Sequence, residues 1–292
     1  MKSALYDPAF LQRLTNLRFM VRGALGGKVR GERRGPRPGV GVEFRDFRAY
    51  VPGDDIRYLD WNVYRRLERL VLKLFVEEED LCLHLLIDGS ASMGYGQPSK
   101  FDYALKAAAA LAYIALSSHE RVAAALFNGG VERAFGPARG KGRMFPLFDF
   151  LGGLSCRGET QFATAVREYL GKIRTGDLIV VLSDFLAAEG FETGLDLLLK
   201  RRCDLALLHL VAPDETNPPL RGAVILQDAE TGETREVVGE DAVVLYRKNL
   251  QTFFDRLEGF CRHRGIDYLR LSTSVPLEDL VLRHLRVAGI LG

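Results

Sequence analysis

The chain has 292 residues, of which 47% are hydrophobic and 27% are charged. This balance is typical of a soluble globular protein with one large domain or two smaller ones, and it excludes disordered and fibrous proteins. The 40 lysines and arginines nearly balance the 38 aspartates and glutamates, which leaves a formal net charge of +2. A net charge so small selects neither nucleic acid nor a membrane surface as a partner, so any such preference must be local.

The cysteines and the start of the chain bear on its location. Four cysteines are widely spaced and form no C-x-x-C pair; they are Cys82, Cys156, Cys203 and Cys261. The first residues lack the apolar core of a secretion signal, and no run approaches the roughly 20 apolar residues of a membrane-spanning helix. We therefore expect a cytoplasmic protein with reduced thiols and no membrane span.

Charge divides the chain into two regions. Residues 1–76 contain 16 basic and 8 acidic side chains, so this segment is strongly basic while the remainder is acidic. An apolar pattern before residue 22 predicts a short helix, the Gly/Pro/Arg stretch 26–39 predicts a loop, and alternating apolar residues at 40–44 predict a strand. We expect an N-terminal basic region with a small β module at 1–77 and a second domain at 78–292.

The second region alternates short apolar runs with amphipathic segments, a pattern typical of an α/β fold with a doubly wound, mostly parallel sheet. Between residues 213 and 246 the pattern breaks, which predicts an inserted β-hairpin with its turn near Thr231-Gly232. The predicted strands are 81–87, 122–127, 178–182, 205–211 and 268–271, with 131–135 as an edge partner. The predicted helices are 101–117, 144–151, 160–173, 191–200, 247–264 and 276–287.

Oxygen-bearing side chains gather at one predicted edge of this sheet. Asp88, Ser90 and Ser92 follow the first core strand, Thr160 opens a predicted helix, and Asp184 ends another apolar strand. Ligands of open α/β sheets bind outside the carboxyl ends of the strands, where these segments meet. A set of hydroxyl and carboxylate oxygens suits Mg²⁺, Mn²⁺ or Ca²⁺ and does not suit structural zinc.

Each of these residues also has an ordinary structural interpretation. Ser90 and Ser92 can be turn residues, Thr160 can cap a helix, and Asp184 can form an Asx turn. All four would then have to fall at the same edge of the sheet by coincidence, so we favour the metal site.

These residues carry a family resemblance. The pattern Asp88-x-Ser90-x-Ser92, followed by Thr160 and Asp184, resembles the metal-ion-dependent adhesion site of von Willebrand factor type A domains. Segment 48–61 upstream is similar to the signature of the domain-of-unknown-function 58 family, and this likeness covers most of the chain. The resemblance implies a type A, Rossmann-like fold, an association with AAA+ ATPases of the MoxR type, and no established enzymatic activity.

Two charged segments near the N-terminus allow more than one interpretation. The first combines a Pro-Gly turn with opposite charges and aromatic rings, and its residues are Arg48, Asp54, Asp55, Arg57, Asp60 and Trp61. It can be a salt-bridged structural element or a partner-binding surface. The loop 28–37 can be a solvated connection, or it can bind phosphate, anionic lipid or an acidic protein face.

Three classes of function therefore stay open. We favour a non-enzymatic interaction module that binds an acidic side chain of a protein partner through its metal. The first alternative is a binder of nucleic acid or an anionic membrane surface through the basic segment. The second is a Mg²⁺-dependent hydrolase, which the sequence supports poorly, because Asp88 lacks the second aspartate of a phosphatase and neither a G-x-S-x-G elbow nor a phosphate-binding loop is present.

Overall fold

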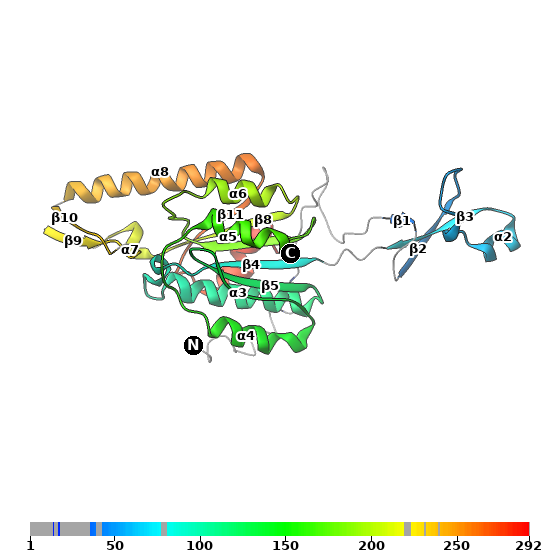
Figure 1. The fold of residues 1–292 in the computed structure, drawn as a ribbon, viewed down its shortest axis with the longest axis horizontal. Helices are drawn as coiled ribbons and strands as arrows, with labels where there is room; N and C mark the ends of the chain where they lie inside the picture. The colour runs from blue at the N-terminus through cyan, green and yellow to red at the C-terminus, as the bar shows by residue number, and fades with distance from the viewer. Residues whose placement is uncertain are drawn as a thin grey trace. The chain divides into compact units, whose positions relative to one another are not determined.

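A computed structural model of the chain describes residues 14, 17, 36–38, 43–76, 81–218, 223–230, 232–238 and 240–291 (Figure 1). Most of the predicted N-terminal helix and most of the loop 26–39, including its basic part 28–37, lie outside the described residues. The chain divides into two compact units, one of residues 1–25 and 81–292 and the other of residues 26–80.

The larger unit contains a six-stranded sheet with the order β11-β8-β7-β4-β5-β6. All neighbouring strands are parallel except β6, which pairs antiparallel with β5. This arrangement confirms the predicted α/β fold with a mostly parallel sheet. The strands are β4 (Cys82–Asp88), β5 (Arg121–Phe127), β6 (Val131–Arg139), β7 (Leu178–Ser183), β8 (Asp204–Val211) and β11 (Asp267–Ser272).

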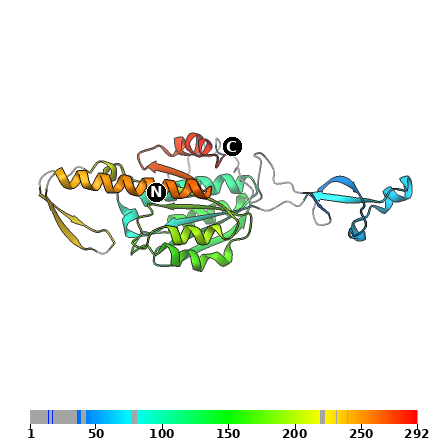
Figure 2. The same ribbon diagram turned by 90° about the horizontal axis from the view of Figure 1, so that it is seen from above.

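Helices cover both faces of this sheet (Figures 1 and 2). Alternate residues of β4 point to opposite faces, so Leu83 and Leu85 enter one apolar layer and Leu86 enters the other. The first layer includes α3 (Lys100–Ser117), α4 (Met144–Gly152) and the C-terminal turns α9 (Leu277–Asp279), η5 (Leu280–His284) and α10 (Leu285–Val287). The second includes α5 (Phe162–Tyr169), α6 (Glu192–Leu199) and α8 (Glu240–Arg264).

The inserted hairpin consists of β9 (Ala223–Gln227) and β10 (Thr234–Val238), preceded by the short helix α7 (Pro213–Thr216). Thr231, where the turn was expected, lies outside the described residues. Several predicted boundaries were wrong: α5 begins at Phe162 rather than at 160, α8 begins at Glu240 rather than at 247, and β6 extends to Arg139 rather than ending at 135. The apolar run Val243 to Tyr246 resembles a strand, yet Val244 and Leu245 are exposed on an extension of α8 beyond the core.

The smaller unit is an antiparallel three-stranded sheet with the order β1-β3-β2. Its strands are β1 (Pro36–Pro38), β2 (Glu43–Ala49) and β3 (Val71–Val76), and η1 (Ile56–Tyr58) and α2 (Trp61–Leu67) lie between β2 and β3. The strand expected at 40–44 is therefore observed from residue 43 onward.

The strand order identifies one special place in the large sheet. From β4 the chain proceeds to β5 and β6 on one side, and it then returns to add β7, β8 and β11 on the other. Between β4 and β7 the connections leave in opposite directions, and open α/β sheets bind ligands at the carboxyl ends of strands at such a point. Asp88 and Asp184 lie at the carboxyl ends of these two strands.

Candidate functional site

Asp88 is the last residue of β4, and its side chain is fully buried. Its Oδ1 accepts a hydrogen bond from the backbone N–H of Ser90 at 2.9 Å, and its Oδ2 accepts one from Ser183 Oγ at 2.5 Å. Burial, together with the nearby charge of Asp184, raises the pKa of Asp88 to about 7. Negative charge at this place is therefore costly unless a cation compensates it.

The two serine hydroxyls after β4 converge. Ser90 Oγ lies 3.0 Å from Ser92 Oγ, and Ser90 is fully buried. Gly89 allows this turn, because a Cβ at that position would lie 2.7 Å from Cδ1 of Leu126 on β5. Adjacent ligands of an octahedral Mg²⁺ with bonds of about 2.1 Å are about 3.0 Å apart, so the hydroxyl spacing fits such an ion.

The loop that precedes Thr160 is hydrogen-bonded to this turn through backbone groups. Arg157 N donates to Gly89 O at 2.6 Å, and Ala91 N donates to Gly158 O at 2.9 Å. Thr160 is buried and lies two residues before α5, whose capping position is Gln161. The threonine hydroxyl bonds to a carboxylate, Glu230 Oε1, at 3.3 Å.

Asp184 follows β7 directly and is also buried. Its Oδ1 accepts from the backbone N–H of Leu186 at 3.0 Å, which is an Asx turn, and its Oδ2 accepts from Lys100 Nζ at 2.7 Å. Lys100 also donates to Glu215 Oε1 at 2.5 Å. Burial lowers the pKa of Lys100, but the charges of Asp184 and Glu215 outweigh that effect and the pKa is raised.

The backbone beside Asp184 has an unusual conformation. Phe185 has a φ of +57°, a left-handed value that bulky residues rarely adopt, and its ring is buried. Such conformations cost of order 1–3 kcal/mol and cluster at functional sites. The Ser183 hydroxyl accepts from Phe185 N at 2.8 Å while it donates to Asp88, so one serine connects this turn to β4.

The structure thus places Asp88 at the end of β4, Ser90, Ser92 and Asp184 on the turns after β4 and β7, and Thr160 just before α5. Hydrogen bonds join Asp88 to Ser90 N and the two serine hydroxyls to each other, whereas Thr160 bonds to Glu230 and Asp184 bonds to Lys100. Four residues in these contacts were missed by the sequence analysis; they are Lys100, Ser183, Glu215 and Glu230. One signal was available for Lys100, because a lysine in the first turn of a helix opposes the helix dipole and needs a local anion. The sequence offers no comparable signal for Glu230.

The donors at this edge suit a hard cation. Hydroxyl oxygens predominate, two buried carboxylates add negative charge, and the Ser90–Ser92 spacing fits octahedral coordination. Within the part of the chain that the structure describes, no group of three or more His, Cys, Asp or Glu side chains could hold a metal. A site here would therefore depend on the serine and threonine hydroxyls.

The charged segment of the small unit forms local ion pairs. Arg48 Nη2 lies 2.8 Å from Asp54 Oδ1, and Arg57 Nη2 lies 2.6 Å from Asp55 Oδ2. These contacts lower the pKa of both aspartates, chiefly through the hydrogen bonds from the arginines. Asp60 caps α2 by accepting from Asn62 N and Val63 N, and the next residue, Trp61, is 60% exposed. The acidic residues thus have structural roles, while Trp61 is available at the surface.

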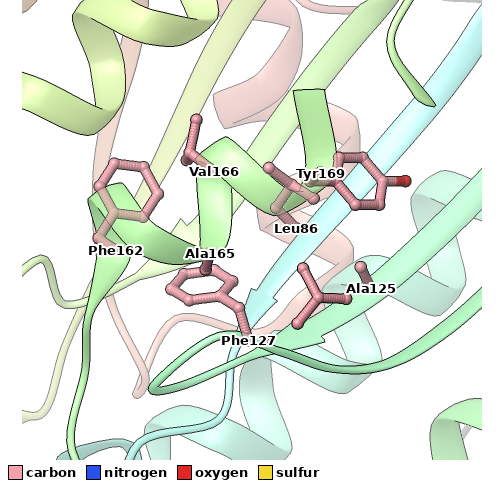
Figure 3. A pocket seen from close by; sticks show the side chains of 8 residues that line it. Leu86, Ala125, Phe127, Phe162, Ala165, Val166 and Tyr169 are labelled. Carbon is pink, nitrogen blue, oxygen red and sulfur yellow. The ribbon is translucent and has the colours of Figure 1, made fainter. Parts of the chain in front are cut away.

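A small hollow lies against α5, on the second apolar layer (Figure 3). Its lining is apolar apart from the hydroxyl of Tyr169, which bonds to His84 Nδ1 at 3.0 Å. The lining residues are Leu86, Ala125, Phe127, Val131, Phe162, Ala165, Val166 and Tyr169. With its one hydroxyl already engaged, this hollow offers no polar recognition and is a packing gap of the core.

All four cysteines are free thiols, and burial raises the pKa of Cys82, Cys203 and Cys261 to about 12. Among the described residues, no helix combines the length and the apolar character needed to cross a bilayer.

Two solved structures are similar to this chain. One is the conserved hypothetical protein BatB from Bacteroides thetaiotaomicron, which is 15% identical with a TM-score of 0.44 and covers 71% of this chain and 98% of its own. The other is an aerotolerance-related membrane protein from Bacteroides fragilis, which is 16% identical with a TM-score of 0.46 and covers 72% and 98%, respectively.

The chain also has sequence relatives. Uncharacterized proteins of Mycobacterium bovis and Mycobacterium tuberculosis are 29% identical to it over 237 residues, which is 79% of this chain and 74% of theirs. The model of one family, described as "Protein of unknown function DUF58", matches residues 46–253 and so spans both units. The match covers well over half of the sequence, and the chain therefore belongs to the DUF58 family.

Proposed function

We propose that the chain is a non-enzymatic, metal-dependent protein-interaction module, and that its larger unit is a von Willebrand factor type A domain. In this proposal Asp88, Ser90, Ser92, Thr160 and Asp184 form a metal-ion-dependent adhesion site for one Mg²⁺ or Mn²⁺. The observation that carries it is the pair of converging hydroxyls, 3.0 Å apart, at the strand-order reversal and beside two buried carboxylates.

In this proposal, hydroxyl oxygens contact the ion and carboxylates supply negative charge. Ser90 and Ser92 hold their hydroxyl oxygens 3.0 Å apart, and in this proposal Thr160 supplies a third hydroxyl from the neighbouring loop. Asp88 supplies a negative charge, while that of Asp184 is shared with Lys100. A cation held mainly by neutral oxygens keeps most of its positive charge, so it attracts an external carboxylate strongly. When bound, such an ion would supply this attraction.

The partner in this proposal is a protein that presents an acidic side chain. We assign this role to a MoxR-type AAA+ ATPase or its client, acting in the cytoplasm, on the basis of the family resemblance and the chemistry of the site. Both oxygens of Asp88 already accept hydrogen bonds, from Ser90 N and Ser183 Oγ, which makes this carboxylate a poor nucleophile. That geometry favours binding over hydrolysis.

The test measures metal and partner binding together. Calorimetry with Mn²⁺ is performed on the wild type, on Asp88→Ala and on Ser90→Ala, with Ser118→Ala at the far end of α3 as the control. Biolayer interferometry then measures the complex with the MoxR-type ATPase of the same organism in Mg²⁺ and in EDTA. We expect Asp88→Ala and EDTA to abolish binding, Ser90→Ala to weaken it, and their effects not to add, since they remove the same contact.

A complex of equal strength in EDTA would end the adhesion-site mechanism. Mn²⁺ binding that survives Asp88→Ala would instead overturn the site itself.

A further inference from the structure

A carboxylate of the chain itself already lies at the candidate site. Glu230 is located at the tip of the β9–β10 hairpin, 70 residues after Thr160. Its two oxygens accept from the two donors of that threonine: Oε2 from the backbone N–H and Oε1 from the hydroxyl, each at 3.3 Å. Thr160 is thus a predicted site residue that, among the described contacts, bonds to an acidic side chain from the hairpin.

The hairpin tip is shaped by its own hydrogen bonds. Asp228 N donates to Glu233 O at 2.8 Å, Gly232 N donates to Asp228 O at 3.0 Å, and Glu230 N donates to Asp228 Oδ1 at 2.8 Å. Gly232 has a φ of +75°, which glycine adopts without strain. Glu230 therefore lies on a preformed turn. Because the turn is already ordered, less conformational entropy is lost when its side chain binds.

One face of the hairpin is exposed to solvent. The described side chains of its strands are exposed; they are Ile225 (72%), Gln227, Thr234 and Glu236. Figures 1 and 2 show the hairpin beside the start of α8, away from the layers that cover the sheet. The two hydrogen bonds, at 3.3 Å each, are longer than the usual range and stabilise the closed position only modestly. Opening of these two bonds would release both donors of Thr160 from the tip.

We infer that Glu230 is an internal ligand of the candidate site, which covers Thr160 and competes with the carboxylate of a partner. The inference rests on the proposed function and adds its regulation: a partner with an acidic turn binds by displacing the hairpin tip. The competition follows from position, because Glu230 bonds to Thr160, one of the residues proposed to hold the ion, and the carboxylate of a partner must approach the same ion. If the tip covers the site nine-tenths of the time, the apparent affinity for the competitor is about tenfold lower than for the open site.

The experiment uses the full chain and a probe made from its own tip. The probe is a fluorescent peptide with the sequence of residues 226–234, and its anisotropy is measured with wild type, Glu230→Gln and Glu236→Gln in Mn²⁺ and in EDTA. Glu236→Gln is the matched control, since Glu236 is a glutamate of the same hairpin with its side chain exposed. A peptide with glutamine at the position of Glu230 controls for contacts other than the carboxylate.

We expect Glu230→Gln to bind the probe about tenfold more tightly than the wild type or Glu236→Gln, only in Mn²⁺ and only with the glutamate peptide. Its own affinity for Mn²⁺ should stay within about twofold of the wild type. Equal probe binding by all three proteins, or no probe binding by any of them, overturns the inference. A tenfold loss of Mn²⁺ affinity in Glu230→Gln also overturns it, because Glu230 would then be a resident ligand. Failure of the proposed function is seen separately, as Mn²⁺ binding that survives Asp88→Ala.

Discussion

The ammonium nitrogen of Lys100 lies 2.7 Å from Oδ2 of Asp184, and both side chains are almost completely buried. Lys100 is the first residue of α3, where the helix dipole disfavours a cation. Its place is explained by Asp184 and by Glu215, whose Oε2 in turn accepts from Ala212 N at 2.7 Å after β8. One lysine thus connects the start of α3 with the carboxyl ends of β7 and β8.

Replacing Lys100 by methionine should destabilise the protein. The change leaves Asp184 and Glu215 buried without their cation, and breaking a buried pair in this way costs about 3–5 kcal/mol. Urea denaturation measures the loss in unfolding free energy, with Lys106→Met on the same helix as the control. If both variants lose the same amount, the ion pair contributes nothing beyond the packing of a lysine stem.

Replacing Asp88 by asparagine should separate metal binding from folding. Asparagine keeps the shape of the side chain and can still accept from Ser90 N, and burying a neutral amide costs less than burying a carboxylate. We expect an unchanged or higher melting temperature without metal, and Mn²⁺ affinity lower by at least about tenfold. Scanning calorimetry with and without Mn²⁺ measures both, because metal stabilises only a protein that binds it. A Mn²⁺-dependent rise in melting temperature that persists in the variant would contradict this prediction.

Replacing Gly89 by alanine should strain the turn that carries the two serines. The new Cβ would lie 2.7 Å from Cδ1 and 2.9 Å from Cγ of the buried Leu126. Overpacking of this kind costs about 1–3 kcal/mol. Gly171→Ala is the control, because no atom lies within 4 Å of the Cβ built there. Equal unfolding free energies for the two variants would show that the Leu126 side chain moves aside without destabilising the protein.

A buried histidine on the second apolar layer should make stability depend on pH. His209 Nδ1 lies 2.7 Å from the hydroxyl oxygen of Tyr268, among the rings of Phe185, Phe253 and Phe254. Burial lowers the pKa of His209 to about 3, against an ordinary 6.5. The charges around it are Asp184, which raises this pKa, and Arg270 and Lys100, which lower it.

Below pH 6.5 the unfolded chain protonates His209 while the folded chain does not, so the unfolded state binds more protons. Stability should therefore fall as the pH decreases from about 6.5 towards 3, by up to about 1.4 kcal/mol per unit from this residue. The double variant His209→Phe/Tyr268→Phe keeps the rings and removes both polar groups. Its unfolding free energy should fall less steeply over this range in urea titrations at several pH values. Parallel profiles for the two proteins would exclude His209 as the cause.

The strands of the large sheet could be predicted because their residues are buried on both faces. Runs such as 178–182 are continuously apolar, and short runs of this kind between turn residues are distinctive of parallel strands. The start of α8 could not be predicted from the same signal. Its first turns extend beyond the core, so Val244 and Leu245 follow no burial pattern that a sequence could display.

The candidate site was predictable only where the donors adjoin the strands. Asp88 and Asp184 directly follow apolar runs, so the topology alone brings them to one edge. Lys100 and Glu230 reach that edge from a helix start and from a hairpin tip, and their contacts depend on the path of the whole chain. Long-range side-chain pairing of this kind has no local pattern in the sequence.

The order of the site's parts along the chain has a consequence for synthesis. Translation adds about 5–20 residues per second, so the interval between Asp184 and Glu230 lasts roughly 2–9 s. Throughout it, the residues from Asp88 to Asp184 have been made, while the hairpin tip that contacts Thr160 does not yet exist. In every newly made molecule, the hydrogen bonds between Thr160 and Glu230 can therefore form only after this interval.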